Sequence, residues 1–132
     1  MKDLLCRILV IAVLMGGVGA VGTSYGDEVR PFTITLIISP KNIVLGADGQ
    51  WITAHTDIAL STVDCTSLEL NGVSVAWTDA DAQGNLVAKF SKSEIDAIVS
   101  PPGALLILTG ATDDGVLFSG ADEVRVTEQG QR

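Results

Sequence analysis

The chain has 132 residues and a formal net charge of −8 at pH 7. That length allows one domain of ordinary size. The negative charge disfavours nucleic acid and anionic lipid as partners, because both require a basic surface.

The first element is a predicted secretory signal peptide at residues 1–26. A short basic start, with Lys2 and Arg7, precedes an apolar run at residues 8–15 and a tail rich in glycine. These three parts are typical of a cleavable export signal, whereas a membrane-spanning helix needs about 20 apolar residues. The cut position stays open between residues 20 and 26. We therefore expect export to the periplasm, the cell surface or the medium, with no membrane insertion after cleavage.

The mature chain is expected to hold a β-sandwich domain at residues 27–128 and a frayed tail at residues 129–132. Cys6 would leave with the signal, so Cys65 would be the only cysteine of the mature chain and no disulfide could form within it. Burial of Cys65 is the favoured interpretation, because a free cysteine is among the most buried residue types. The alternative is an exposed thiol that pairs between chains.

Short β-rich runs alternate with turn residues along the mature chain, which is typical of a sandwich or a barrel. Strands are predicted at residues 32–38, 43–45, 51–58, 68–70, 73–75, 86–90, 104–109, 116–119 and 124–126. Period-two alternation places Ile52, Ala54 and Ile58 inward in the third of these strands. The run at 104–109 is apolar throughout and is predicted to be buried on both faces. The phenylalanines are all predicted at inward positions: Phe32, Phe90 and Phe118.

The clearest local signal is a hairpin with a two-residue turn at Asn71-Gly72. Both residues tolerate the positive φ of a type I′ turn, and such a turn pairs Leu70 with Val73. The resulting register places five apolar side chains on one buried face: Leu68, Leu70, Val73, Val75 and Trp77.

One short helix is predicted at residues 91–99. Ser91 and Glu94 have the spacing of a capping box, in which each side chain bonds to a free backbone N–H of the first turn. Pro101 and Pro102 end the helix. About two turns would be marginal alone, so packing has to hold the helix in place.

Several motifs along the chain resemble an immunoglobulin-like domain family of unassigned function found in exported bacterial and archaeal proteins. The motifs are Ser39-Pro40, Gly49-Gln50-Trp51-Ile52, an acidic D-x-D-x-x-G loop, Lys89-Phe90 and Phe118-x-Gly-x-Asp-x-Val-Arg-Val. The resemblance covers almost the whole mature chain. It implies an immunoglobulin-like sandwich, and the residue pattern itself predicts about seven to nine short strands with one connecting helix. It implies no catalytic activity.

The acidic loop at residues 79–85 is a candidate calcium site. Asp79, Asp81 and Gln83 have side-chain oxygens at positions 1, 3 and 5 of a calcium loop, Gly84 has the position of the sharp turn, and Asn85 would offer a backbone carbonyl. Position 12, where a bidentate glutamate is expected, is a phenylalanine. The loop therefore predicts weak calcium binding, and the alternative is a solvated hairpin loop.

Trp51 is the candidate ligand contact, because it begins a strand and its face is not determined by the pattern. Stacking of an exposed indole on a sugar ring would suit a small carbohydrate or ligand binder. A hydrolase would need His55 and Asp57 beside a hydroxyl such as Ser61 or Ser74, and no nucleophile motif is present. The carboxylate pairs Asp113-Asp114 and Asp122-Glu123 are assigned to turn and strand-start positions.

The sequence therefore predicts an exported, non-catalytic structural or interaction module, with weak calcium in the 79–85 loop. The alternative is a carbohydrate- or ligand-binding module that uses Trp51. The partner would be a protein or a surface polymer, and the residues do not identify it.

Overall fold

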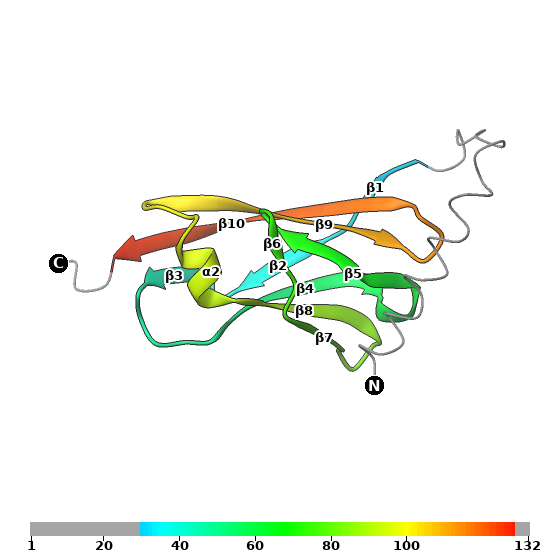
Figure 1. Ribbon diagram of the computed structural model, residues 1–132, viewed down its shortest axis with the longest axis horizontal. Helices are drawn as coiled ribbons and strands as arrows, with labels where there is room; N and C mark the ends of the chain where they lie inside the picture. Colours follow the sequence, from blue (N-terminus) through cyan, green and yellow to red (C-terminus); the bar gives the residue numbers. More distant parts are fainter. Residues whose placement is uncertain (1–29, 129–132) are drawn as a thin grey trace.

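Ten strands, one α-helix and one 3-10 helix make up residues 30–128, the part of the chain that the computed structural model describes (Figure 1). In chain order they are β1 (Phe32–Thr33), β2 (Leu36–Ser39), β3 (Asn42–Leu45), β4 (Trp51–Ala59), η3 (Leu60–Thr62), β5 (Val63–Leu70), β6 (Val73–Ser74), β7 (Trp77–Ala80), β8 (Asn85–Ser91), α2 (Lys92–Asp96), β9 (Gly103–Thr112) and β10 (Leu117–Glu128). The predicted signal peptide and the predicted tail lie outside the described residues. No helix within residues 30–128 is long and apolar enough to cross a membrane.

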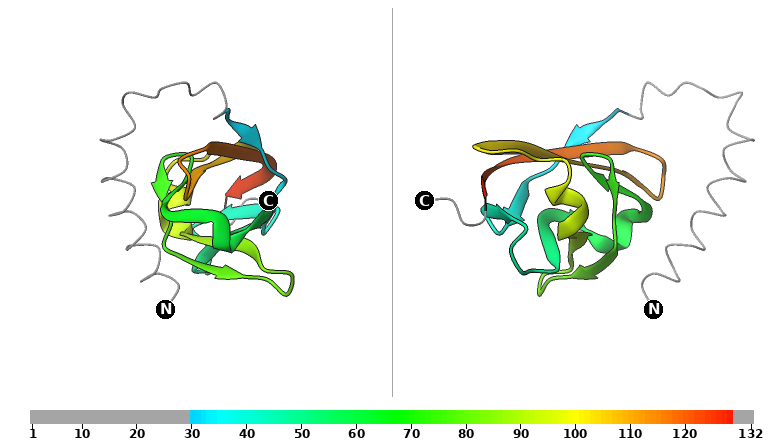
Figure 2. Two further views of the ribbon diagram at one scale, coloured as in Figure 1. Left: turned by 90° about the vertical axis from the view of Figure 1, so that its right-hand side faces the viewer. Right: turned by 60° about the vertical axis from the view of Figure 1, so that its left-hand side comes forward.

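The strands form two sheets that pack as separate layers (Figures 1 and 2). Sheet A has six strands in the order β1-β10-β9-β5-β6, with β3 pairing farther along β10, and sheet B has four in the order β2-β4-β8-β7. Neighbouring strands are antiparallel, except that β1 and β3 both run parallel to β10. The predicted all-β sandwich is therefore confirmed at the level of two packed sheets.

The core lies between the two layers and is mostly aliphatic. Its largest fully buried side chains are Phe90, Ile38, Ile43, Ile52, Leu68, Leu70, Leu86, Ile95, Leu106, Leu108, Val63 and Val126. Burying each side chain of this size contributes about 1.5–3 kcal/mol. The inward positions predicted for β4 are correct, because Ile52 and Ala54 are fully buried and Ile58 packs against the core.

The first predicted strand is divided between the two sheets. β1 pairs with β10 in sheet A, and β2 pairs with β4 in sheet B, so the chain crosses between layers around Ile34. Gly120 of β10 permits this crossing, because a Cβ there would lie 2.9 Å from the Ile34 carbonyl oxygen. Phe32 lies at the edge of sheet A and is 39% exposed, so its predicted inward position is wrong. Its ring still contacts Phe118, with centroids 5.8 Å apart.

The predicted hairpin is confirmed, but its last apolar residue is not on the predicted face. Leu70 pairs with Val73, and Asn71 and Gly72 have φ values of 50° and 88°. After β6 the chain leaves sheet A and enters sheet B as β7, where Trp77 pairs with Lys89. Because period-two alternation holds only within one strand, the crossing moves Trp77 to the outer face of sheet B.

Two predictions for the last strands are corrected. Leu106 and Leu108 of β9 are fully buried, but Leu105 is 50% and Ile107 39% exposed, so β9 is buried on one face only. An apolar run does not reveal whether a second layer covers its outer face. β10 is one continuous strand, which places Asp122 inside a strand and not at a turn or strand start.

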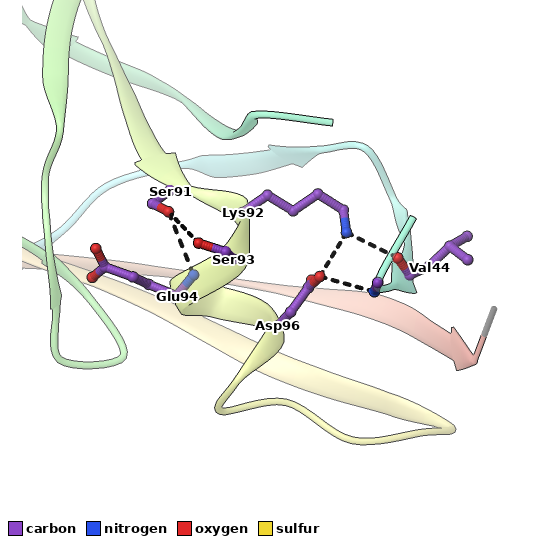
Figure 3. A network of polar contacts seen from close by, with 7 residues as sticks. Val44, Ser91, Lys92, Ser93, Glu94 and Asp96 are labelled. Atoms are coloured by element: carbon purple, nitrogen blue, oxygen red, sulfur yellow. Dashed lines mark hydrogen bonds and ion pairs between the residues drawn. The ribbon is translucent and has the colours of Figure 1, made fainter. Parts of the chain in front are cut away.

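The helix α2 is shorter than predicted and is held by an ion pair. Ser91 Oγ accepts a hydrogen bond from the Glu94 backbone N–H at 3.4 Å, as the capping spacing predicts. Lys92 is buried, and its Nζ donates to Asp96 Oδ2 at 2.7 Å and to the Val44 carbonyl at 2.9 Å (Figure 3). The ion pair stabilises the helix internally, and the hydrogen bond to Val44 connects the helix to β3.

Candidate functional site

Two tryptophans meet on the outer face of sheet B. Trp51 begins β4 and is 37% exposed, and Trp77 begins the edge strand β7. Their ring centroids are 6.3 Å apart and their planes are inclined by 85°, which is the edge-to-face arrangement that aromatic rings favour. The contact spans β8, which lies between their two strands. The fold therefore brings together two large aromatic side chains that are 26 positions apart in the sequence.

Lys89 lies beside this tryptophan pair. Its backbone is opposite Thr53 on one side and Trp77 on the other, so the three side chains form one row across the sheet. The Lys89 ammonium is 5.4 Å from the centroid of the Trp77 ring, which is a cation–π distance. It donates to Thr53 Oγ1 at 3.4 Å, a long and weak hydrogen bond.

The alternation along β8 explains why Lys89 faces outward. Leu86, Ala88 and Phe90 are fully buried, so the residues between them lie on the other face of the sheet. Ser91 continues that outer face opposite Trp51. The surface that results combines indole rings, hydroxyl groups and one ammonium. Such a combination suits a ligand with both apolar ring faces and polar groups.

The rest of the outer face of sheet B is mixed in character. His55 is exposed on β4, and its cross-strand neighbours are Ile37 on β2 and Val87 on β8. Asp57 is exposed on the same strand, but its Oδ1 accepts a hydrogen bond from the Thr35 backbone N–H at 3.0 Å. Ser74 belongs to β6 in sheet A. The structure therefore does not bring His55, Asp57 and Ser74 together as a catalytic set.

The predicted calcium loop is the hairpin turn between β7 and β8. Asp81 Oδ1 accepts hydrogen bonds from the backbone N–H groups of Gln83, at 2.8 Å, and of Asn85, at 2.9 Å. Gly84 has a φ of 84°, as the predicted sharp turn requires. The carboxylate of Asp81 thus closes the turn by bonding to the backbone, which is a common structural use of aspartate.

Asp79, the other charged member of the predicted calcium set, lies within β7 opposite Val87. Its Oδ1 accepts a hydrogen bond from the Ala80 backbone N–H at 2.8 Å. Within residues 30–128, no group of three or more His, Cys, Asp or Glu side chains could hold a metal ion. Calcium at this loop stays a prediction.

Asp122 acts as a link between the two sheets. From an inward position of β10 it accepts a hydrogen bond from the Ile38 backbone N–H of β2, at 2.8 Å, and it forms an ion pair with Lys41. The Ile38 hydrogen bond, followed by the Lys41 hydrogen bond, holds the pKa of the Asp122 carboxyl below its ordinary value. The ionised carboxylate is therefore part of the folded structure.

Asp113 lies in the turn between β9 and β10, and its surroundings disfavour the ionised carboxylate, in contrast to those of Asp122. Its Oδ1 is buried and has no hydrogen-bond partner in the described part of the chain. Burial raises the pKa of the Asp113 carboxyl, and the negative charges of Asp64 and Asp114 raise it further. The turn that the sequence predicts here is confirmed. Its Asp113 carboxylate is partly desolvated without a compensating hydrogen bond at Oδ1 within residues 30–128.

Cys65 is buried in β5, as predicted, with its Sγ 3.8 Å from Thr78 Oγ1. Burial of Cys65 is thus confirmed, and the state of its thiol in the mature chain stays a prediction.

Shallow surface hollows occur near Pro102, away from the tryptophans. One is lined by Pro101, Pro102 and residues 125–128, and another by Lys41, Asn42, Pro102 and residues 123–125. Neither is lined by an aromatic side chain. Comparisons of the chain with protein-family models, with curated proteins and with solved structures found no match.

Proposed function

We propose that this protein is an exported, non-catalytic binding module that holds a carbohydrate against Trp51 and Trp77. The observation that carries the proposal is the edge-to-face pair of indole rings on the outer face of sheet B. The two tryptophans lie outside the buried core of the sandwich, and Trp51 leaves more than a third of its surface in water. A half-exposed indole beside hydroxyl groups is a suitable surface for stacking a sugar ring.

The immunoglobulin-like assignment is part of this proposal. It is supported by the division of the first strand between the two sheets and by the parallel pairing of β1 and β3 with β10. The N-terminal sequence pattern supports export. The separation of His55 from Ser74 on different sheets supports a non-catalytic module.

The direct test is a titration of tryptophan fluorescence in the exported protein with soluble oligosaccharides. We expect a saturable change in the wild-type protein, because a sugar ring on Trp51 alters the surroundings of its indole. Trp51→Ala is expected to weaken binding by at least about tenfold, since an aromatic anchor contributes about 2 kcal/mol or more.

Ile107→Ala is the matched control, because Ile107 has a similar exposure but lies on the outer face of sheet A. It should leave the titration unchanged. Equal binding by Trp51→Ala and wild type would contradict the proposal that the carbohydrate binds against the two tryptophans.

A further inference from the structure

Resting on this carbohydrate-binding proposal, we infer that the bound saccharide is acidic, and that Lys89 pairs with its carboxylate or sulfate group. The inference starts from how the lysines of the described region are used. Lys41 forms an ion pair with Asp122, and Lys92 forms one with Asp96. Lys89 has no carboxylate partner within residues 30–128. Among the described residues, its ammonium contacts Thr53 through a long hydrogen bond and the face of the Trp77 ring.

The position of Lys89 makes its charge available to a ligand on the tryptophans. The Trp51 ring and the Lys89 ammonium both lie against the Trp77 ring, at 6.3 Å and 5.4 Å. A saccharide stacked on Trp51 and extending over Trp77 therefore reaches the ammonium. Thr53 and Ser91, on either side, offer hydroxyl groups on the same face.

The cost of covering Lys89 favours an acidic ligand over a neutral one. A ligand that covers this face removes water from the ammonium, and an ammonium without a counter-charge is costly to desolvate. A carboxylate or sulfate compensates that cost with a charge-assisted hydrogen bond, which is stronger than a bond to a neutral hydroxyl. The overall charge of −8 repels polyanions at long range, so recognition depends on this local cation.

The carboxylates on the outer face of sheet B have backbone hydrogen bonds of their own and lie in other rows than Lys89. Asp57 uses its Oδ1 to accept the Thr35 N–H bond, and Asp79 uses its Oδ1 to accept the bond from Ala80. Both belong to other rows of the sheet than Lys89, because Asp79 is opposite Val87 and Asp57 lies beyond His55.

The test compares ligands that share a sugar backbone but differ in charge. One pair is oligogalacturonate and its methyl ester, and the other is a dextran sulfate oligomer and the same dextran without sulfate. At low salt we expect the wild-type protein to bind the acidic member of at least one pair about tenfold more tightly. The pair that shows the preference identifies the anionic group as carboxylate or sulfate. High salt should reduce the preference.

Lys89→Gln should abolish the preference, because the affinity for the acidic ligand should fall to about that for the neutral one. Lys41→Gln is the matched control, because it removes the same charge at a site away from the tryptophan face, and it should keep the preference. Lys89→Arg should also keep it.

The possible failures are distinguishable. Equal affinity for acidic and neutral ligands, with both lost in Trp51→Ala, would overturn the inference and leave the carbohydrate proposal standing. An acid preference that persists in Lys89→Gln would also overturn it. Absence of binding to every saccharide would end the proposed function and the inference together.

Discussion

Lys92 and Lys89 are three residues apart in the chain, and the structure uses them in opposite ways. Lys92 is buried at the start of α2, where Asp96 and the Val44 carbonyl both accept hydrogen bonds from its ammonium. Lys89 is half-buried on the outer face of sheet B, where its ammonium contacts the Trp77 ring and, within residues 30–128, forms just one long hydrogen bond, to Thr53. The fold uses the first charge, and we propose that the second one serves a ligand.

Lysines that stabilise the fold and lysines that are available for binding differ in their partners within the chain. A charge that serves the fold has strong partners within the chain, and its removal costs stability. A charge that serves binding has weak partners, and its removal leaves stability nearly unchanged. The two lysines therefore make opposite predictions for the same substitution.

The largest effect is expected for Lys92→Ala. It leaves Asp96 in a partly buried position without its cation, and Asp96 Oδ1 already lacks a hydrogen-bond partner in the described region. Breaking such a pair costs about 3 kcal/mol. Chemical denaturation of Lys92→Ala and Lys89→Ala would measure the contrast, with a loss of less than about 1 kcal/mol expected for Lys89→Ala. Similar losses in both variants would break the distinction between the two lysines.

A smaller effect is expected for the ion pair between the third lysine, Lys41, and Asp122. Lys41 is 58% exposed, so the Asp122 hydrogen bond to Ile38 is the main contribution. Asp122→Asn should cost about 1–2 kcal/mol at pH 7, because the backbone N–H of Ile38 loses its charged acceptor.

The pH dependence of Asp122→Asn follows from the lowered pKa of Asp122. Since the fold favours the ionised carboxylate, its contribution is complete above the ordinary pKa of 3.8 and declines as the pH falls below it. Thermal unfolding of wild type and Asp122→Asn between pH 7 and pH 2 should therefore converge at the acidic end. A constant difference across that range would show that the charge of Asp122 has no role.

The smallest effect concerns the calcium prediction for the 79–85 loop. An ion at about ten times its Kd adds about 1.4 kcal/mol, so millimolar calcium should raise the melting temperature by a few degrees over the protein in chelator. Asp79→Ala with Asp81→Ala should remove that rise. A flat response up to about 10 mM calcium would contradict the prediction, because weak extracellular sites fill by then.

Local signals in the sequence predicted local structure well. Asn71-Gly72 specified its turn and the pairing of Leu70 with Val73, and Ser91 with Glu94 specified the start of α2. These features depend on residues within a few positions of one another. The face of Trp77 was predicted wrongly because the chain changes sheets just before it. Side-chain direction alternates regularly within a strand but not across such a crossing.

The same limit applies to the candidate site. Trp51 was identified as a candidate contact, but its contact with Trp77 depends on the registers of both β4 and β7 against β8. A signal for that register was present, since the turn closed by Asp81 and Gly84 sets Trp77 opposite Lys89. Counting back along both strands from that turn would have placed Trp77 beside Lys89 on one face, whereas the position of Thr53 depends on the pairing of β4 with β8.

The parallel pairing of β1 and β3 with β10 has a mechanical consequence. β1 enters at one end of the long axis, and β10 leaves at the other (Figure 1). A force that pulls residues 30 and 128 apart therefore slides β1 and β3 lengthwise against β10. The hydrogen bonds along those ladders are loaded together, in shear, and do not open one after another as in a zipper. The sandwich should therefore resist a force along its strands better than a force perpendicular to them.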